Sequence, residues 1–300
     1  TKDAWYHAPG RDEGEVVEKF WMPNPTKINA LADALGVGVL QRYGDAERCI
    51  ATANGVLDLG SGELLEHSPD RFNLSSLPFD YDPDAECPAW EAFLESVLPG
   101  DLAAHAFLAE WFGYVISGSN DQQKMLSLVG PPRCGKGTVA RVLSALLGPD
   151  VVAAPILDKL GGQFGEQNLI GKKLAIMGDV RWKSRNAGAA VPVLLMITGD
   201  DERDIPRKNQ KDWHGRLDVR FVVMSNDVPE FSDTSGALAD RMMHVEFRTS
   251  FLGREDISLR ERLLKELPGV LNWSLRGLER LRDRGHFAPP ESGHELAREV

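Results

Sequence analysis

A glycine-rich stretch at residues 130–138 has the residue types and the spacing that phosphate binding needs. An apolar, strand-like run (125–129) precedes it, and a run with apolar residues at helical spacing (139–147) follows it. Glycines allow backbone N–H groups to turn towards an anion, and the helix N-terminus and Lys136 add positive charge. The pattern predicts a phosphate-binding loop, with a plain structural turn as the alternative. Its residues are Gly130, Pro131, Pro132, Arg133, Cys134, Gly135, Lys136, Gly137 and Thr138.

Thr138 supplies the hydroxyl group that such loops use to hold Mg²⁺ beside the phosphates. Gly137 separates it from Lys136, so the hydroxyl lies one position later than in the usual pattern. Some nucleoside-monophosphate kinases also read Gly-Lys-Gly-Thr. The loop alone therefore leaves a kinase open as an alternative.

Asp179 follows a second strand-like run, residues 173–177. A carboxylate at the end of such a strand can hold Mg²⁺, directly or through water, and can help to position an attacking water molecule. It can also be an ordinary turn residue. Many ATPases place two adjacent acids here, but Gly178 precedes Asp179, so a second acid must come from elsewhere. Glu166 and Asp158 are the candidates for it.

Asn226 follows a third strand-like run, residues 220–224, and Arg241 lies further along the chain. An amide at the end of a strand can hydrogen-bond the γ-phosphate or the attacking water and so sense hydrolysis. An arginine that reaches the γ-phosphate of a neighbouring subunit stabilises the charge of the transition state. The alternatives are a plain turn at Asn226 and a salt bridge between Arg241 and the adjacent Asp240.

Residues 207–216 form a basic stretch in an otherwise acidic chain. Cationic side chains can neutralise nucleic-acid phosphates, and a tryptophan can stack on a base or brace the loop. The flanking residues favour a hairpin with Gly215 where the chain leaves the turn, and an ordinary solvated loop is the alternative. The residues expected to contact nucleic acid are Arg207, Lys208, Lys211, Trp213 and His214.

The composition limits the class of protein. A net charge of −11 over 300 residues argues against a broad DNA-binding surface, but not against a small basic patch in a pore or groove. The cysteines Cys49, Cys87 and Cys134 form neither a disulfide framework nor a zinc site, which fits a reducing cytoplasm. Long apolar runs are absent, so no membrane partner is expected. Because the chain begins at Thr1 and ends in an unfinished helical pattern (295–300), we expect a fragment of a longer protein.

Strand-like runs that alternate with longer helical stretches predict an α/β fold with a central, mostly parallel sheet and helices on both faces. Ligands of such sheets bind beyond the carboxyl ends of the strands, where Thr138, Asp179 and Asn226 would meet. Before the loop, Pro88 is expected to begin one helix and Asp101 to cap another. We expect a small mixed or helical N-terminal cap region at 1–86, a helical layer at 87–120, a P-loop ATPase core at 121–250 and a C-terminal helical region at 251–300.

Residues 78–290 resemble the C-terminal helicase module of phage and plasmid primase–helicases, in helicase superfamily 3. The order and spacing of several stretches carry the resemblance, and the first 77 residues resemble the N-terminal cap of that module only loosely. The matching stretches are Gly-Tyr-Val at 113–115, the loop at 130–138, 174–181, Ile-Thr-Gly-Asp-Asp at 197–201, 221–229, 235–241 and Glu-Leu-Pro-Gly-Val-Leu-Asn-Trp at 266–273.

The resemblance implies an AAA+-like ATPase that assembles as a hexameric ring and binds ATP with Mg²⁺ between subunits. Lys136 and Thr138 would belong to the phosphate loop, and Asp179 to the second acidic motif. Asn226 would be the sensor, and Arg241 the finger from the neighbouring subunit. The basic loop would be the hairpin that grips single-stranded DNA in the channel. The family often carries an upstream primase–polymerase domain, and its site of action would be the cytoplasm of a bacterial host.

The sequence therefore predicts a DNA-stimulated ATPase that translocates on single-stranded DNA and unwinds duplex DNA. Two positions depart from the family pattern: Pro192 and Val193 stand where an acidic–basic pair is usual, and Asp240 stands where a basic or neutral residue is common. The alternatives are a nucleotide or small-molecule kinase, and a protein that binds ATP only to assemble or load a ring.

Overall fold

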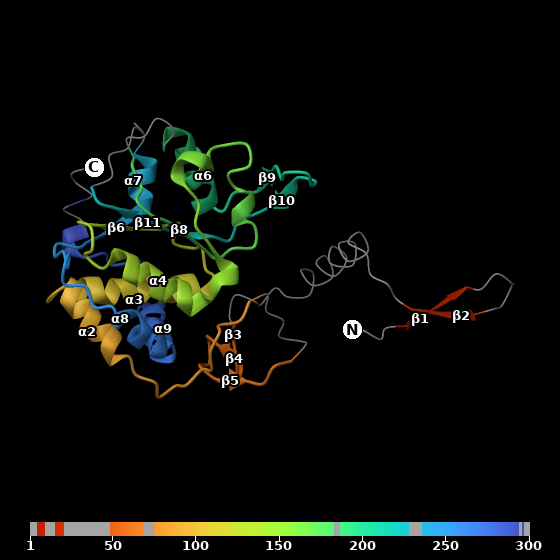
Figure 1. Ribbon diagram of the computed structural model, residues 1–300, viewed down its shortest axis with the longest axis horizontal. Coiled ribbons are helices and arrows are strands. Elements are labelled where there is room, and N and C mark those ends of the chain that lie inside the picture. Colours follow the sequence, from red (N-terminus) through yellow and green to blue (C-terminus); the bar gives the residue numbers. More distant parts are fainter. Residues whose placement is uncertain are drawn as a thin grey trace. The chain divides into compact units, whose positions relative to one another are not determined.

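The computed structural model describes residues 5–9, 16–20, 49–68, 75–182, 187–227, 236–293 and 296. The chain forms two compact units, Thr1–Ala46 and Glu47–Val300. In the first unit, strands β1 (Trp5–Pro9) and β2 (Val16–Phe20) pair in antiparallel fashion (Figure 1). The four regions expected from the sequence stay a prediction, and most of the expected terminal helix lies outside the described residues.

A small antiparallel sheet begins the second unit. It consists of β3 (Cys49–Thr52), β4 (Gly55–Asp58) and β5 (Leu64–Leu65), with β4 in the middle. Asn54, in the turn between β3 and β4, exchanges two hydrogen bonds with the backbone of Tyr81, at 2.8 and 2.9 Å. These bonds attach the small sheet to the extended segment that leads into the helical layer.

The core of the second unit is a five-stranded sheet in the order β12-β6-β11-β8-β7, in which every neighbouring pair is parallel. Its longer strands are buried along almost their whole length, as in parallel sheets that are covered on both faces. This confirms the predicted α/β fold with a mostly parallel sheet. The strands are β6 (Met125–Val129), β7 (Val152–Ala153), β8 (Leu174–Met177), β11 (Arg220–Ser225) and β12 (Met242–Glu246).

Helices cover both faces of this sheet (Figure 1). Alternate residues of β11 point to opposite faces, so Val222 joins one apolar cluster while Phe221 and Val223 join the other. Within the described ranges, no helix is both long and apolar enough to cross a membrane. One layer consists of α2 (Pro88–Val97), α3 (Leu102–Ser117), α4 (Lys136–Leu147), α8 (Leu259–Lys265) and α9 (Leu267–Arg284), the other of α5 (Leu157–Leu160), α6 (Ala187–Thr198) and α7 (Ala237–Arg241), and short 3₁₀ turns span Pro149–Val151 and Gln167–Leu169.

The starts of α2 and α3 agree with the sequence prediction. Pro88 is the first residue of α2, and the side chain of Asp101 caps α3 through a 2.9 Å hydrogen bond from the backbone N–H of its third residue. The start of α2 is also capped by a residue that is distant in the sequence. The carboxylate of Glu266 accepts hydrogen bonds from the N–H groups of Ala89 and Trp90, at 3.0 and 2.9 Å. The start of α9 thereby fixes the position of α2.

Helices α3 and α9 approach each other closely because glycines lie at their contact. A Cβ atom on Gly113 would lie 2.4 Å from the carbonyl oxygen of Ser274, and one on Gly277 would lie 2.2 Å from the carbonyl carbon of Ala109. Both neighbours are backbone atoms, which cannot turn away as a flexible side chain can. The close packing of α3 against α9 therefore depends on the absence of side chains at these two positions.

We expect Gly277→Ala to destabilise the protein, because the added methyl group must push α3 away from α9. Overpacking of this kind costs about 1–3 kcal/mol, and the better helix propensity of alanine offsets about 1 kcal/mol of it. Chemical denaturation measures the change in the free energy of unfolding. Arg276→Ala, at an exposed position of the same helix, is the matched control and should change it by less than about 0.5 kcal/mol. Equal stability of the two variants would contradict the close approach.

Candidate functional site

The glycine-rich loop leaves the carboxyl end of β6 and leads directly into α4, as the sequence predicts. Its shape depends on two glycines. Gly130 has a φ of +151°, and a Cβ there would lie 2.2 Å from the carbonyl oxygen of Phe247. Gly135 has a φ of +105°, and a Cβ there would lie 2.8 Å from a methyl carbon of Val97 in α2. The loop is therefore held between α2 and the segment that follows β12.

Lys136 folds back over the loop and connects it with Asn226. Its Nζ donates hydrogen bonds to the carbonyl oxygens of Gly130 and Pro131, the latter at 2.9 Å, and to Asn226 Oδ1 at 3.3 Å. Cys134 Sγ lies 3.4 Å from the same nitrogen. The lysine is only 8% exposed, so these oxygens replace water around its charge. The structure thus brings two predicted site residues into contact at the carboxyl ends of β6 and β11.

A cavity of about 890 Å³ opens beside the loop. Residues 132–138 line one side of it, together with Asp179 and Asn226 from the ends of β8 and β11. Thr138 belongs to this lining, and its hydroxyl accepts a 3.2 Å hydrogen bond from Arg141 Nη2. The structure therefore gathers the predicted residues around one space beyond the carboxyl ends of the strands.

Thr138 and Asp179 bring a hydroxyl and an exposed carboxylate to this cavity. Mg²⁺ prefers oxygen ligands of this kind and usually takes one or two carboxylates together with the phosphates of a substrate. Among the residues that the structure describes, no group of three or more His, Cys, Asp or Glu could hold a metal. Thr138 and Asp179 are the side chains of the lining that could hold Mg²⁺ together with a bound phosphate.

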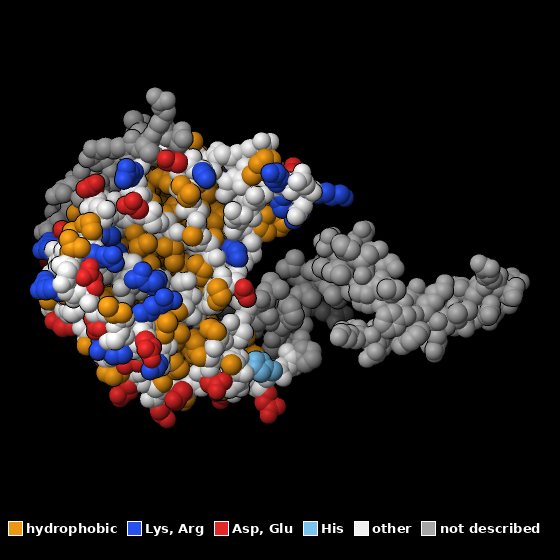
Figure 2. Space-filling view, viewed as in Figure 1, with side chains coloured by type: hydrophobic (Ala, Val, Ile, Leu, Met, Phe, Trp, Pro, Cys, Tyr) orange, Lys and Arg blue, Asp and Glu red, His pale blue; other side chains and the backbone are white. Residues whose placement is uncertain are grey.

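The lining of the cavity carries more positive than negative charge. Two of its carboxylates are already paired, Glu255 with Arg133 at 3.6 Å and Asp256 with Arg262 at 2.6 Å. Figure 2 shows Lys and Arg side chains gathered over the part of the face where Figure 1 labels α2, α4 and α8. Five cations, Arg133, Lys136, Arg141, Arg254 and Arg262, face three carboxylates, Asp179, Glu255 and Asp256.

Arg141 shows how crowded these cations are. Burial of its guanidinium lowers the pKa of Arg141, and the positive charges of Arg260 and Arg133 lower it further. A polyanion that entered the cavity would offset this repulsion. The electrostatics therefore suit a ligand with several phosphates.

One wall of the cavity comes from residues that no sequence motif pointed to. Helix α2 and residues 251–262 form it, and the second segment is tied to the loop by a 3.0 Å hydrogen bond from Phe251 N to Arg133 O. The helix that was expected to begin at Pro88 packs its aromatic side chains, Trp90 and Phe93, into the core. The small residues on its other side, at helical spacing, were the signal that it also borders a space: Ala89, Ala92 and Ser96.

Neither candidate for a second acid lies at the cavity. Both carboxylate oxygens of Glu166 lie 2.6 Å from nitrogen atoms of Arg203, and this ion pair is largely buried. Asp158 does not line the cavity either. Asp179 therefore has no carboxylate partner from either of the positions that the sequence suggested.

Arg241 lies near the amino ends of the strands, whereas the loop lies at their carboxyl ends. It ends α7 just before β12, whose first residue pairs with Met125 at the start of β6. The loop begins after Val129, so the length of β6, about 16 Å, separates the two ends. Arg241 Nη1 instead donates hydrogen bonds to Leu195 O and to Thr198 Oγ1. Arg241 is therefore not part of the cavity of its own chain.

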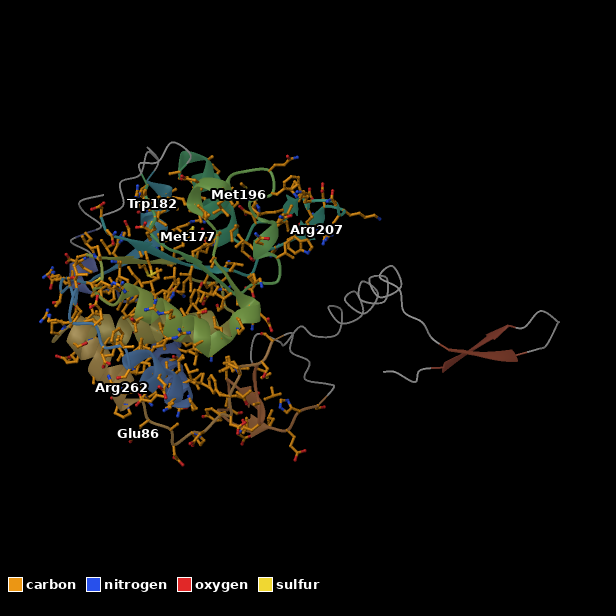
Figure 3. All side chains as sticks on the ribbon, in the orientation of Figure 1. Glu86, Met177, Trp182, Met196, Arg207 and Arg262 are labelled. Atoms are coloured by element: carbon orange, nitrogen blue, oxygen red, sulfur yellow. The ribbon has the colours of Figure 1, made fainter. Side chains whose placement is uncertain are left out.

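The basic stretch forms the predicted hairpin. Strands β9 (Arg203–Ile205) and β10 (Trp213–Gly215) pair in antiparallel register, with Gly215 opposite Arg203. Figure 3 labels Arg207 on this hairpin and Arg262 beside the cavity, and the two lie on well-separated parts of the second unit. The nucleic-acid candidates and the phosphate candidates therefore occupy different places.

Three of the five hairpin candidates are engaged by protein groups, and one of them is Arg207, whose Nε donates a 2.8 Å hydrogen bond to Lys211 O. Trp213 is half-buried, lies over Gly215 and packs against the apolar cluster on its face of the sheet, which favours a bracing role. His214 Nδ1 lies 2.8 Å from Asp204 Oδ1. Lys208 and Lys211 lie in the turn between the strands, where Figure 2 shows Lys and Arg side chains at the tip. These lysines, with Arg207, are the cations that the hairpin presents.

The sequence matches two protein families. One is a family of unknown function (DUF5906), over residues 128–241, and the other is described as D5 N terminal like, over residues 28–99. The uncharacterized mitochondrial protein ymf21 of Marchantia polymorpha is 29% identical over 115 residues, which are 34% of this chain and 64% of that protein. The match to the family of unknown function, over residues 128–241, contains the loop, Asp179 and Asn226.

Three apo structures of the NrS-1 C-terminal region are similar in fold. Their TM-scores are 0.54, 0.56 and 0.58, at sequence identities of 16%, 16% and 18%. Each similarity covers 73% of this chain and 53% of the NrS-1 chain. The chain thus spans about half the length of those structures, and the likeness extends over most of its second unit.

Proposed function

We propose, from the premise that the chain is a module of the phage and plasmid primase–helicase type, that it is an ATP-driven DNA helicase motor. The D5 N terminal like match and the fold shared with the NrS-1 region support the premise, which suggests an enzyme of DNA replication. One observation carries the proposal: Lys136 contacts Asn226 at the edge of a cavity with a positively charged lining. Hydrolysis of ATP needs such a pair, a cation for the phosphates and a polar group for the attacking water.

In this proposal the loop binds the β- and γ-phosphates of ATP. Binding draws Lys136 from its carbonyl partners to the phosphates, where its charge stabilises the transition state. Asn226 then orients the water that attacks in line with the leaving phosphate. Thr138 and Asp179 would hold Mg²⁺ beside the phosphates, and the ion would supply positive charge that offsets part of theirs. The apolar wall of α2 faces the rest of the nucleotide.

The proposed motor hydrolyses ATP at the interfaces of a ring. Arg241 is about 16 Å along the sheet from the loop of its own chain, which supports a role in the site of a neighbour. In a closed ring of head-to-tail contacts, the surface of each subunit that carries Arg241 would face the surface of the next subunit that carries the loop. We expect the hexamer that the family resemblance implies.

The hairpin β9–β10 is the proposed contact for single-stranded DNA in the channel of that ring. Binding confined to a channel reconciles a net charge of −11 with a nucleic-acid partner, because only the hairpin need be positive. In the full-length protein, an upstream primase–polymerase domain would act on the same DNA. The proposed place of action is the cytoplasm of the bacterial host.

Lys208→Ala combined with Lys211→Ala is expected to weaken binding of single-stranded DNA and to flatten its salt dependence. Each lysine that neutralises a phosphate contributes about 0.7 to the slope of log K against log salt, so the slope should fall by about 1.4. Fluorescence anisotropy with a labelled oligonucleotide measures it. Lys159→Ala combined with Lys172→Ala, which removes the same charge elsewhere, is the control. An unchanged slope in the hairpin variant would remove the hairpin from the channel.

The fate of the γ-phosphate of ATP separates this function from its rivals. A motor transfers it to water, a nucleotide or small-molecule kinase transfers it to an acceptor, and an assembly or loader protein retains ATP. With γ-labelled ATP and Mg²⁺ we expect the label to appear as inorganic phosphate. Label on an added nucleotide would support the kinase, and label retained as bound ATP in a ring would support the assembly role.

A further inference from the structure

We propose that the C-terminal turn of α6 positions the guanidinium of Arg241, with Thr198 as the positioning residue. The inference rests on the proposed role of Arg241 in a neighbour's site. Thr198 itself touches no phosphate in this account. It acts through the arginine, whose direction it fixes.

The hydroxyl of Thr198 has two backbone acceptors for its single proton, Leu194 O at 2.7 Å and Leu195 O at 3.3 Å, and the shorter contact is the better hydrogen bond. Because the hydroxyl donates this proton, its oxygen can only accept the 2.6 Å hydrogen bond from Arg241 Nη1. Thr198 is 2% exposed, so water does not compete for this oxygen. Leu195 O accepts a second hydrogen bond from the same Nη1. Two acceptors on one nitrogen fix the plane of the guanidinium as well as its place.

Gly199 makes room for the guanidinium. A Cβ atom at this position would lie 3.3 Å from Arg241 Nη1, 3.5 Å from Nη2 and 3.0 Å from Leu195 O. The arginine therefore lies directly against the backbone of the turn. Alanine here would displace the guanidinium by a few tenths of an ångström without removing either acceptor.

The charge of Arg241 also suits the end of α6. The carbonyl groups at a helix C-terminus carry partial negative charge, and the last turn of α6 has no basic residue of its own. Both hydrogen bonds that Arg241 makes within the described part of the chain use Nη1. Nη2 and Nε are therefore left to contact a phosphate. A finger needs such an arrangement, in which one nitrogen is anchored and others are available to a phosphate.

The Arg241-binding turn, which consists of Leu195, Thr198 and Gly199, is separate from the hairpin that is proposed to bind DNA. The hairpin is attached nearby through Arg216, which lies 3.2 Å from the Asp200 carboxylate and 3.5 Å from the Glu202 carboxylate. Changes at Thr198 leave these side chains intact. Affinity for single-stranded DNA should therefore stay unchanged in variants of the Arg241-binding turn.

The first test compares Thr198→Val, which has nearly the same shape without the hydroxyl, with Thr198→Ser, which keeps it. We expect Thr198→Val to lower kcat about tenfold or more while KM and the affinity for ATP stay unchanged, because small misplacements of a catalytic group are costly. Thr198→Ser should recover most of the rate. In an Arg241→Ala background, Thr198→Val should have no further effect. A defect of the same size in that background would mean a merely structural role and would overturn the proposal.

The second test mixes subunits. Lys136→Ala subunits, whose own sites are inactive, should lend Arg241 to Arg241→Ala subunits and restore turnover. Lys136→Ala subunits that also carry Thr198→Val, or Gly199→Ala as an independent change, should restore about tenfold less. Equal restoration by both kinds of subunit would refute the positioning role and leave the motor in place. If plain Lys136→Ala subunits restore nothing, the proposed trans site itself fails.

Discussion

Lys136→Ala is expected to lower ATP turnover at least about a thousandfold. The side chain is the cation closest to the loop carbonyls and to Asn226, and no neighbouring cation in the lining reaches the same carbonyl oxygens. Loss of a single preorganised group that stabilises transition-state charge costs about 10²–10³-fold, and loss of the full charge also weakens binding of the phosphates. Release of phosphate from Mg²⁺-ATP under saturating substrate measures the effect.

Lys265→Ala is the matched control for this prediction. Lys265 lies on α8 and forms an exposed ion pair with Glu261 at 2.8 Å, so its loss removes the same charge without touching the loop. The control should keep normal turnover. Normal turnover by Lys136→Ala would contradict the assignment of the phosphate loop.

Arg241→Ala is expected to bind ATP normally and to hydrolyse it about a thousandfold more slowly. Arg241 lies outside the cavity of its own chain, so its removal should leave nucleotide affinity unchanged. In the ring that we propose, Arg241 would reach the γ-phosphate bound by the neighbouring subunit, so the variant would remove a cation that stabilises the transition state there. Binding of a fluorescent ATP analogue and steady-state hydrolysis, measured on the same preparation, separate the two effects.

Lys124→Ala controls for damage near Arg241. Its Nζ donates a 2.6 Å hydrogen bond to the carbonyl oxygen of Asp240, so it contacts the same turn without being part of the proposed finger. Turnover of this variant should stay within about threefold of normal, as for most surface changes. A weakened affinity for ATP in Arg241→Ala would place the arginine in its own chain's site and contradict a trans role.

Local pattern was enough to predict the parts of the structure that depend on neighbouring residues in the chain. The apolar runs around the loop, the spacing after it and Asp101 before α3 each determine one element, and all are found. The hairpin at 203–215 and the gathering of Asp179 and Asn226 near the loop follow from the same logic. The resemblance to the primase–helicase module is also confirmed, by the D5 N terminal like match and the shared fold.

Long-range contacts were beyond such patterns. The wall formed by α2 and residues 251–262 is held by two long-range contacts: Glu266 caps α2, and Phe251 N donates a backbone hydrogen bond to Arg133 O. Patterns among neighbouring residues do not predict contacts between positions so far apart in the sequence. The same holds for Glu166, whose charge is taken up by Arg203 far along the chain. Trp213 packs against the apolar cluster on one face of the sheet, and this contact depends on residues that are distant in the sequence.

A measurement of ATP turnover with and without single-stranded DNA distinguishes a ring-forming motor from a monomeric kinase. The mass of the protein in solution is determined in parallel. We predict a large assembly whose phosphate release rises when single-stranded DNA is added. The hairpin variant Lys208→Ala with Lys211→Ala should assemble equally well and lose that stimulation. A monomer that turns over ATP at the same rate with or without DNA would contradict the motor and favour the kinase.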